Sequence, residues 1–400
     1  MDFTPRDHYV SRITPFINKN LIKVIVGQRR VGKSYMLLQI IKEIKKINKN
    51  ANIIFVNKEL HEFDIISTNT ELIKYIEEKT DKKKKNYVLI DEVQDIQHFE
   101  KALRSLLVSD KYDLYITGSN AYLLSGELST YLSGRYIEIK IFGLYYNEFL
   151  LFHKLKDTEE SFMLYIKYGG LPYLYNLELR EEVVFDYLKN IYAAILFKDV
   201  VSRHEIRNVA LLESLVKFLA DNVGNLLSAK SISDFLKSQR IAISPSVLLN
   251  YLKWLQEAFF VFKAYRSEIA GKKILEIGQK YYFEDLGLRH SLIGYRTTDI
   301  GKMLENVVYL HMKTAGYEVF VGKNKEMEID FVCEKNNERL YIQVAYLIIN
   351  EKTKEREFGN LLKIQDQHPK YVLSMDRHVS GNYKGIKHMN VRTFLSELIK

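Results

Sequence analysis

Hydrophobic and polar positions follow two alternating patterns over the first 150 residues. Short β-branched or aromatic runs, typical of strands, are separated by segments with helical periodicity. The strand-like runs are 21–26, 52–57, 86–91 and 112–117, and the helical segments are 34–47, 69–79 and 98–108. This alternation predicts a parallel sheet with crossover helices.

The pattern changes after residue 142. Residues 143–210 are helical except at "YGGLP" (168–172), where glycine and proline must turn the chain, and we expect them to form a lid on the sheet domain. Residues 211–296 contain two short helices followed by two strand-like runs, which is a winged-helix pattern. Residues 297–400 form another α/β unit. The fold class is therefore α/β, and boundaries are expected after residues 142, 210 and 296.

Candidate chemistry begins with "GQRRVGKS" (27–34), which matches G-x-x-x-x-G-K-[ST] at every fixed position. The motif follows a predicted strand and precedes a predicted helix, as a phosphate-binding P-loop requires. Glycines at 27 and 32 allow backbone N–H groups to face a phosphate. Lys33 is expected to reach the β- and γ-phosphates, and Ser34 to bind Mg²⁺. The expected nucleotide-binding residues of the loop are Gly27, Gln28, Arg29, Arg30, Val31, Gly32, Lys33 and Ser34.

The strand-like run at 86–91 is followed by a second feature of such a site, because "YVLIDE" ends in two acidic residues. Carboxylates at the end of a buried strand are costly unless they meet a cation, so Asp91 is predicted to bind Mg²⁺ or its water. Glu92 is then placed to act as a general base on the attacking water. Glu92 is the residue that predicts hydrolysis in addition to binding.

Three further residues have open assignments. Ser119, with Asn120 as second choice, is a candidate sensor of the γ-phosphate at the end of the next strand. Arg135 is a candidate source of positive charge for the transition state, in cis or from a neighbouring subunit, so an oligomer is possible. It is equally consistent with the loop setting that Ser119 only helps to form a turn and that Arg135 is an ordinary surface residue. Arg29 and Arg30 are compatible with phosphate contacts and with pairing to lid carboxylates.

Composition narrows the cellular setting more than the function. The net charge of +9 is spread over both halves of the chain, and its densest patches, 42–50 and 82–85, are typical of solvated lysines. Charge alone therefore does not show a DNA partner. The single cysteine, Cys333, excludes an internal disulfide, and no apolar run reaches the roughly 18 residues of a membrane span. We expect a cytoplasmic protein without a membrane partner.

The chain resembles a family of AAA+-type archaeal and bacterial ATPases in which a winged helix joins the ATPase part to a restriction-endonuclease-like domain. The blocks that carry the resemblance are "IKVIVGQRRVGKS", "YVLIDEVQ", "LYITGSNAYLLSGELSTYLSGRY", "YGGLP" and "FKDVVSRHEIR". The resemblance implies a P-loop ATPase core at 1–142, a helical lid at 143–210, a winged helix at 211–296 and a nuclease-like domain at 297–400. It also implies ATP and Mg²⁺ as cofactors, with hydrolysis acting on a nucleic acid or a protein partner.

The nuclease-like resemblance implies an active site that is incomplete here. Such sites use a helix carboxylate, a strand acid and an acid-x-lysine pair, which hold Mg²⁺ and activate water. Glu305 and Asp330 match the first two, but Gln343 and Ala345 stand where the acid and the lysine belong. We therefore expect a nuclease-like fold that serves as a binding or docking platform and does not cleave nucleic acid.

The second predicted helix of the winged-helix pattern offers little positive charge. Its expected exposed positions are Ser246, Asn250, Lys253 and Gln256, with one cation among them. DNA readers usually present several. Two hypotheses therefore remain open: a Mg²⁺-dependent ATPase that acts on a nucleic acid or protein partner, and a nucleotide-gated DNA- or protein-binding module with little turnover.

Overall fold

The computed structural model describes residues 3–121, 132, 134–241, 243–269, 274–325, 327–379 and 381–399, with the backbone alone at 275–277. The chain divides into two compact units. Unit 1 comprises Met1–Phe142 and Glu257–Phe259, and unit 2 comprises Gly143–Gln256 and Phe260–Lys400.

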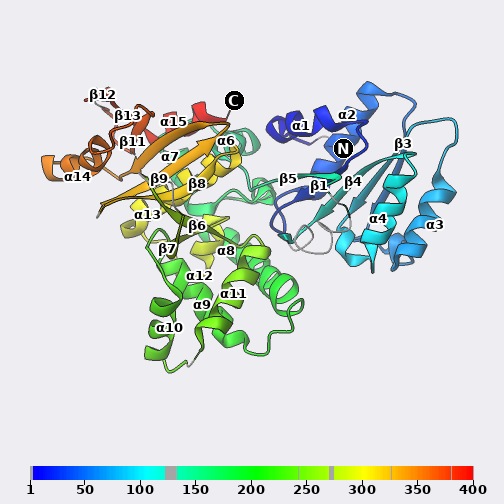
Figure 1. Ribbon diagram of the computed structural model, residues 1–400, viewed down its shortest axis with the longest axis horizontal. Coiled ribbons are helices and arrows are strands. Elements are labelled where there is room, and N and C mark those ends of the chain that lie inside the picture. Colours follow the sequence, from blue (N-terminus) through cyan, green and yellow to red (C-terminus); the bar gives the residue numbers. More distant parts are fainter. Residues whose placement is uncertain are drawn as a thin grey trace. The chain divides into compact units, whose positions relative to one another are not determined.

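Unit 1 is built on a five-stranded sheet with the order β2-β3-β4-β1-β5 (Figure 1). All of its strand pairs are parallel. The strands are β1 (Ile22–Val26), β2 (Asn52–Asn57), β3 (Asn86–Asp91), β4 (Tyr112–Gly118) and β5 (Tyr136–Lys140). Parallel strands joined by helices confirm the predicted α/β class for this part of the chain.

The helices of unit 1 lie on both faces of this sheet. They are α1 (Asp7–Ile13), α2 (Lys33–Ile47), α3 (Asn69–Lys79) and α4 (Phe99–Val108), with 3₁₀ turns η1 (Thr14–Phe16), η2 (His61–Phe63) and η3 (Val93–Asp95). The chain moves from β1 outward to β2 through α2, then returns toward β1 through α3 and α4. Because such crossovers are right-handed, α2 covers one face, and α3 and α4 the other.

The sequence pattern did not reveal β5. This strand lies at the edge of the sheet beside β1, and most of its side chains are at least partly exposed. An edge strand lacks the continuous apolar run of a central parallel strand. Strand β2 lies at the other edge, but its apolar run at 53–56 made it predictable, and the observed bounds of β1 to β4 are close to the predicted runs.

A buried ion pair lies near the amino ends of the central strands. Lys23 on β1 is fully buried and pairs with Asp113 on β4. Tyr115 donates its hydroxyl to the other carboxylate oxygen of Asp113 at 2.8 Å. Burial lowers the pKa of Lys23, although the charge of Asp113 opposes this change. Asp113 thus supplies the opposite charge that the buried ammonium group of Lys23 needs within an otherwise apolar strand.

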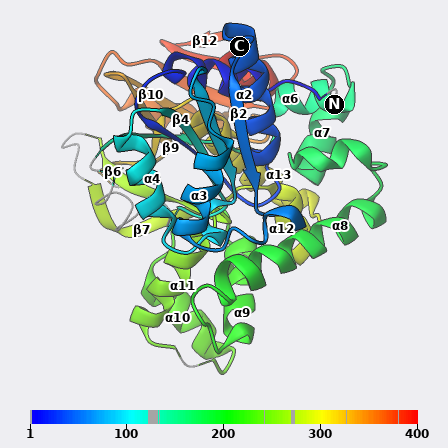
Figure 2. The same ribbon diagram turned by 90° about the vertical axis from the view of Figure 1, so that its right-hand side faces the viewer.

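Unit 2 begins with helices. They are α6 (Tyr146–His153), α7 (Glu159–Tyr168), η5 (Pro172–Asn176), α8 (Glu181–Ala194), the π-helix η6 (Ile195–Val201), α9 (Val209–Asp221), α10 (Ala229–Ser238) and α11 (Pro245–Glu257). A later helix, α12 (Leu286–Ile293), packs against α7, α8 and α9. The segment expected to form a lid, 143–210, thus packs with helices of unit 2. Helices α9, α10 and α11 lie together in both views (Figures 1 and 2).

The second half of unit 2 contains an eight-stranded sheet with the order β12-β13-β11-β10-β9-β8-β6-β7. Its strands are β6 (Val261–Glu268), β7 (Ile274–Phe283), β8 (Glu318–Asn324), β9 (Met327–Lys335), β10 (Glu338–Val344), β11 (Lys370–Ser374), β12 (Gly381–Tyr383) and β13 (Ile386–Asn390). The remaining elements are η7 (Thr297–Asp299), α13 (Ile300–Thr314), α14 (Glu351–Leu362) and α15 (Val391–Leu398).

Helices α10 and α11 are followed by the antiparallel hairpin β6–β7, which is the order of elements that the winged-helix pattern predicts. The hairpin, however, does not form a sheet of its own. Strand β6 pairs in parallel with β8, with Arg266 opposite Val321. The boundary expected after residue 296 therefore falls between elements that share one sheet. Periodicity predicts strands, but it does not specify their non-local partners.

The "YGGLP" segment packs against the carboxylate of Asp285 at the start of α12. Gly169 has a φ of 80°, and a Cβ there would lie 2.3 Å from an Asp285 carboxylate oxygen. The N–H groups of Gly170 and Leu288 donate to the two oxygens of Asp285 at 2.7 and 2.9 Å. Glycine is therefore required for both the backbone conformation and the close approach.

Asp285 predicts a pH dependence of stability. Complete burial raises its pKa to about 6, although several backbone hydrogen bonds oppose this change. A carboxyl group with a raised folded-state pKa stabilises most below its unfolded-state pKa and loses that contribution as the pH rises. The free energy of unfolding of the wild type, relative to Asp285→Asn, should fall by up to about 3 kcal/mol between pH 4 and pH 7. Urea denaturation of both proteins across this range measures the two free energies of unfolding. A wild type that gains stability relative to Asp285→Asn as the pH rises would contradict the raised pKa of Asp285.

Candidate functional site

The P-loop connects β1 to α2 and depends on two glycines. A Cβ on Gly27 would lie 2.3 Å from the carbonyl oxygen of Ile141, so the loop passes too close to the backbone after β5 for any larger residue. Gly32 caps α2 with a φ of 96°, a value that glycine adopts readily. Arg30 adopts a φ of 71° without being glycine, and its side chain is exposed. The N-terminus of α2 thus follows a tightly folded loop.

Lys33 is the first residue of α2, and its ammonium group is directed toward the loop and the acidic pair. Its Nζ atom donates to the carbonyl oxygen of Gln28 at 3.2 Å. The same atom lies 3.4 Å from Oε1 of Glu92. Only 4% of the residue is exposed. The burial shields this ion pair from solvent, so it interacts more strongly than a surface pair.

Asp91 ends β3 and is fully buried beside the P-loop helix. Thr117 on β4 donates its hydroxyl to Oδ1 of Asp91. Burial raises the pKa of Asp91, and Glu92 adds to this, while Ser34, Thr117 and Lys33 oppose it. Oδ2 of Asp91 is buried without a hydrogen-bond partner. A carboxylate in this state still lacks a cation or donor.

Glu92 follows Asp91 in a strained conformation with a φ of 53°. Its N–H donates to Oγ1 of Thr117 at 2.9 Å, and Gln94 donates to its carboxylate. Burial by itself would raise the pKa of Glu92. Lys33, Gln94 and Arg29 outweigh that effect and hold the pKa below its usual value. Glu92 is therefore ionised at neutral pH.

The structure brings the other candidates from the P-loop and β4 to the same edge of the sheet. Gly118 at the end of β4 pairs with Val26 at the end of β1, so Ser119 and Asn120 follow the strand next to the P-loop. Both are buried, and the hydroxyl of Ser119 has no hydrogen-bond partner.

Arg135 does not join this group. It directly precedes β5, and its carbonyl oxygen accepts a hydrogen bond from the N–H of Ile22 at the start of β1. Because β1 and β5 are parallel, Arg135 lies at the amino end of the strands, opposite the edge that carries the P-loop. Its side chain is exposed.

Sequence reasoning missed Thr117 and Gln94. Thr117 contacts both acidic residues because the parallel register of β3 and β4 pairs Ile90 with Ile116, which places the next residues side by side. The strand order would have been the signal for Thr117. The spacing of Gln94 two residues after Glu92 was visible, but the turn conformation that brings the two side chains together was not.

The residues of the nuclease-like prediction converge in unit 2. Oε1 of Gln343 accepts a hydrogen bond from the N–H of Asp330 at 3.4 Å. Lys280, on β7, lies between Asp330 and Glu305 and was not predicted. Burial raises the pKa of Asp330 to about 8, with Glu305 adding to this and Lys280 opposing it.

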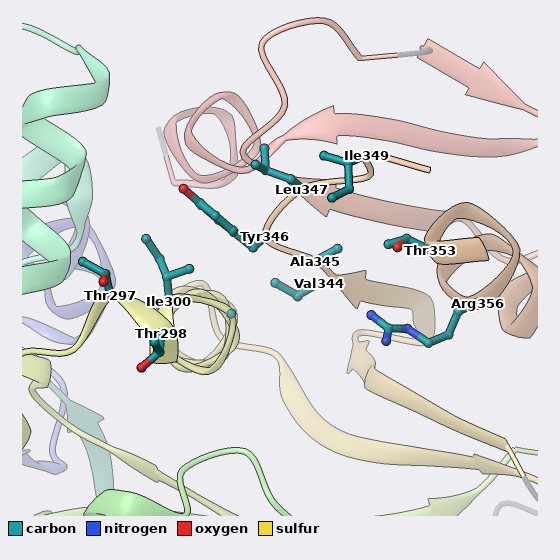
Figure 3. Close-up of a pocket in the computed structure, with 11 residues that line it drawn as sticks. Thr297, Thr298, Ile300, Val344, Ala345, Tyr346, Leu347, Ile349, Thr353 and Arg356 are labelled. Atoms are coloured by element: carbon teal, nitrogen blue, oxygen red, sulfur yellow. The ribbon is translucent and has the colours of Figure 1, made fainter. Parts of the chain in front are cut away.

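Ala345, where the nuclease-like motif would have lysine, lines a separate cavity of about 630 Å³. Figure 3 shows Ala345 between Ile300 and Thr298 on one side and Thr353 and Arg356 on the other. In the described part of the chain, no group of three or more histidine, cysteine or acidic residues is arranged to hold a metal ion.

Comparison with known protein families assigns two parts of the chain. Residues 19–150 match the AAA domain, and residues 159–299 match a domain of unknown function. The first match covers the P-loop and all five strands of unit 1. The second runs from α7 to η7. Unit 1 is thus an AAA domain of the P-loop class. Among the described residues, no helix has the length and hydrophobicity needed to span a membrane.

Two relatives that align with most of the chain define the family. An uncharacterized protein of Haemophilus influenzae is 36% identical over 390 residues, which is 96% of both chains. An uncharacterized protein of Methanocaldococcus jannaschii is 32% identical over 356 residues, covering 84% of this chain and 77% of that protein. The chain belongs to one family with these proteins.

Similarity to solved structures is weaker. The Orc1 protein of Aeropyrum pernix, solved in complex with DNA, matches with a TM-score of 0.34 and 11% identity, over 73% of this chain and 93% of that one. Similarity at this level does not support conclusions about function.

The contacts of Thr117 predict a specific loss of stability. Thr117→Val removes the donor to Asp91 and the acceptor of the Glu92 N–H, and it leaves both groups buried. We expect the free energy of unfolding of unit 1 to fall by about 1–3 kcal/mol. Thr117→Ser keeps the hydroxyl and should recover most of this loss. Thermal or urea denaturation compares the variants, and a Thr117→Val protein as stable as wild type, or less destabilised than Thr117→Ser, would show that the methyl group matters more than the hydroxyl.

Proposed function

We propose that the protein binds ATP at the P-loop and hydrolyses it with Mg²⁺. The observation that carries this proposal is the convergence of Lys33, Asp91 and Glu92 at the carboxyl ends of β1 and β3. Ligands of open parallel α/β sheets bind at this edge. The glycine-rich loop and the N-terminus of α2 supply the backbone N–H groups that favour phosphate.

Mg²⁺ fits the residues around Asp91. Ser34 and Asp91 would hold the ion, directly or through water, and the unpartnered Oδ2 of Asp91 is available to accept it. A bound Mg²⁺ would neutralise charge on the β- and γ-phosphates. Lys33 would add its own positive charge to the same oxygens. The loop residues from Gly27 to Val31 would contribute mainly backbone contacts.

Glu92 is the proposed general base. Its lowered pKa keeps it ionised, so its carboxylate can orient a water molecule and accept its proton. Glu92 pairs with Lys33. A phosphate group competes for Lys33, and Glu92 is then released to act on water. In this proposal the ion pair links occupation of the site to activation of the base.

Further residues have proposed secondary functions. Ser119 has a buried, unpartnered hydroxyl beside the P-loop strand and is suited to sense the γ-phosphate. Arg29 lowers the pKa of Glu92 and lies close enough to contribute charge at the site. Arg135 lies at the opposite edge of the sheet, so a contribution of this residue to the site would have to come in trans, from a neighbouring subunit.

The proposed ATPase acts on a nucleic acid or on a protein partner. The exposed residues of α11 include Ser246, Leu249, Asn250 and Lys253, with a single cation. This composition favours a protein partner or weak DNA contact over strong phosphate binding. The alternative function is a nucleotide-gated binding module with slow turnover. ATPase rates with and without duplex DNA at several salt concentrations distinguish these cases, since stimulation by DNA that fades with salt indicates a DNA-coupled enzyme.

Two substitutions test the ATPase proposal. Lys33→Ala removes the buried phosphate-binding charge and should abolish measurable nucleotide binding. Glu92→Gln keeps the shape of the side chain and removes its basicity, so nucleotide should still bind while turnover falls by about 100-fold or more. Calorimetry and phosphate release measure the two effects. Lys45→Ala, on the exposed side of α2, is the matched control and should behave as wild type. Unchanged turnover in Glu92→Gln would remove Glu92 from the mechanism.

Arg135→Ala tests action between subunits. If Arg135 acts in trans, the substitution should leave nucleotide affinity within about twofold and lower turnover by at least tenfold. Mixing Arg135→Ala with Glu92→Gln then creates some interfaces with both residues intact, and activity should partly recover. Absence of recovery at every mixing ratio would exclude the trans function.

A further inference from the structure

Lys280 forms the centre of a buried ionic cluster in unit 2. Its Nζ atom lies 2.8 Å from Oε1 of Glu305 on α13 and 2.8 Å from Oε1 of Glu328 on β9. Asp330, also on β9, places Oδ1 at 3.7 Å from the same atom. Only 2% of Lys280 is exposed, so its charge is almost fully removed from water and depends on these carboxylates.

Further groups of unit 2 donate hydrogen bonds to the carboxylates of the cluster. Tyr282 on β7 donates its hydroxyl to Oε1 of Glu305 at 2.5 Å. The N–H of Val344 donates to Oδ2 of Asp330 at 2.8 Å. Gly224, after α9, is so close to Glu305 that a Cβ there would lie 3.1 Å from Oε2. These contacts add to those of Lys280 at Glu305 and Asp330.

The cluster occupies the position at which the nuclease-like resemblance implies a metal ion. Glu305 and Asp330 are the two acids that match the implied site, and carboxylates gathered in a buried position require a cation. The ammonium group of Lys280 supplies positive charge between them. Mg²⁺ prefers near-ideal octahedral coordination by oxygen and retains several waters, whereas here the ammonium group of Lys280 stands between the two acids, where the ion would lie.

The lysine comes from a part of the chain that is distant in sequence. Lys280 and Tyr282 lie on β7, in the hairpin that follows α10 and α11. The three acidic residues, Glu305, Glu328 and Asp330, belong to α13 and β9. The hairpin joins the larger sheet through the pairing of β6 with β8. Both the charge pairing and the backbone pairing thus connect the hairpin to the nuclease-like elements.

We infer that Lys280 replaces the divalent cation of the nuclease-like centre, so that this centre binds no catalytic metal and instead anchors the β6–β7 hairpin to α13 and β9. The loss of the lysine at position 345 and of the acid at position 343 is consistent with this conversion. Cleavage of nucleic acid would need a metal that the cluster excludes. This inference is independent of ATP hydrolysis by unit 1.

Mn²⁺ binding to the nucleotide-free, full-length protein tests the inference, measured by electron paramagnetic resonance. Wild type and Asp330→Asn should bind equal amounts of Mn²⁺, because Asp330 holds no metal. Lys280→Ala should gain one Mn²⁺ site that Lys280→Ala/Asp330→Asn lacks, and Mn²⁺ should raise the melting temperature of Lys280→Ala but not of wild type. Lys263→Ala, on the neighbouring strand β6, is the control and should behave as wild type.

Three results would overturn the inference. The first is wild-type Mn²⁺ binding that Asp330→Asn abolishes. The second is metal-dependent DNA cleavage, with Mg²⁺ or Mn²⁺, that Asp330→Asn loses and Lys33→Ala retains. The third is a folded Lys280→Ala protein that gains no Mn²⁺ site. If Lys280→Ala does not fold, the comparison of wild type with Asp330→Asn decides by itself. Equal Mn²⁺ binding without DNA cleavage supports the inference, and Mn²⁺ binding or DNA cleavage that Asp330→Asn loses contradicts it.

Discussion

The parallel pairing of β1 with β4 and of β4 with β3 is the constraint on which the candidate site depends. Parallel strands end at the same edge of a sheet, so the P-loop after β1, the acidic pair after β3 and Ser119 after β4 must meet there. The pairing also sets Thr117 beside Asp91. Its hydroxyl donates to the carboxylate of Asp91 and accepts the backbone N–H of Glu92, so the positions of both residues depend on the core of the sheet.

Burial makes the charges of this edge interdependent. Lys33, Asp91 and Glu92 are almost fully removed from water, and Lys33 lowers the pKa of both carboxyl groups while Glu92 raises that of Asp91. The ionised Glu92 and the partly satisfied Asp91 differ because Lys33 contacts only one of them closely. Two adjacent carboxylates with unlike environments are suited to unlike tasks, which in the proposed mechanism are proton acceptance and cation binding.

Unit 2 uses buried charge for a different purpose. Lys280 joins the hairpin to α13 and β9, Asp285 binds the backbone at Gly170, and Arg289 pairs with Asp299 while donating to the carbonyl oxygen of Ala220. Each of these groups connects segments that are far apart in sequence. Such contacts specify which packing of the helices and strands is allowed, because any other arrangement leaves a buried charge without a partner.

Local patterns in the sequence determined the central strands and helices of unit 1, the P-loop and the acidic pair, because apolar periodicity and a contiguous phosphate motif are properties of short segments. They also predicted the helices α10 and α11 and the hairpin β6–β7. Tertiary structure alone decided that Arg135 lies away from the P-loop edge, that β6 joins β8, and that Lys280 stands between Glu305 and Asp330. These outcomes depend on pairing between distant segments, and periodicity within a segment carries no information about its partner.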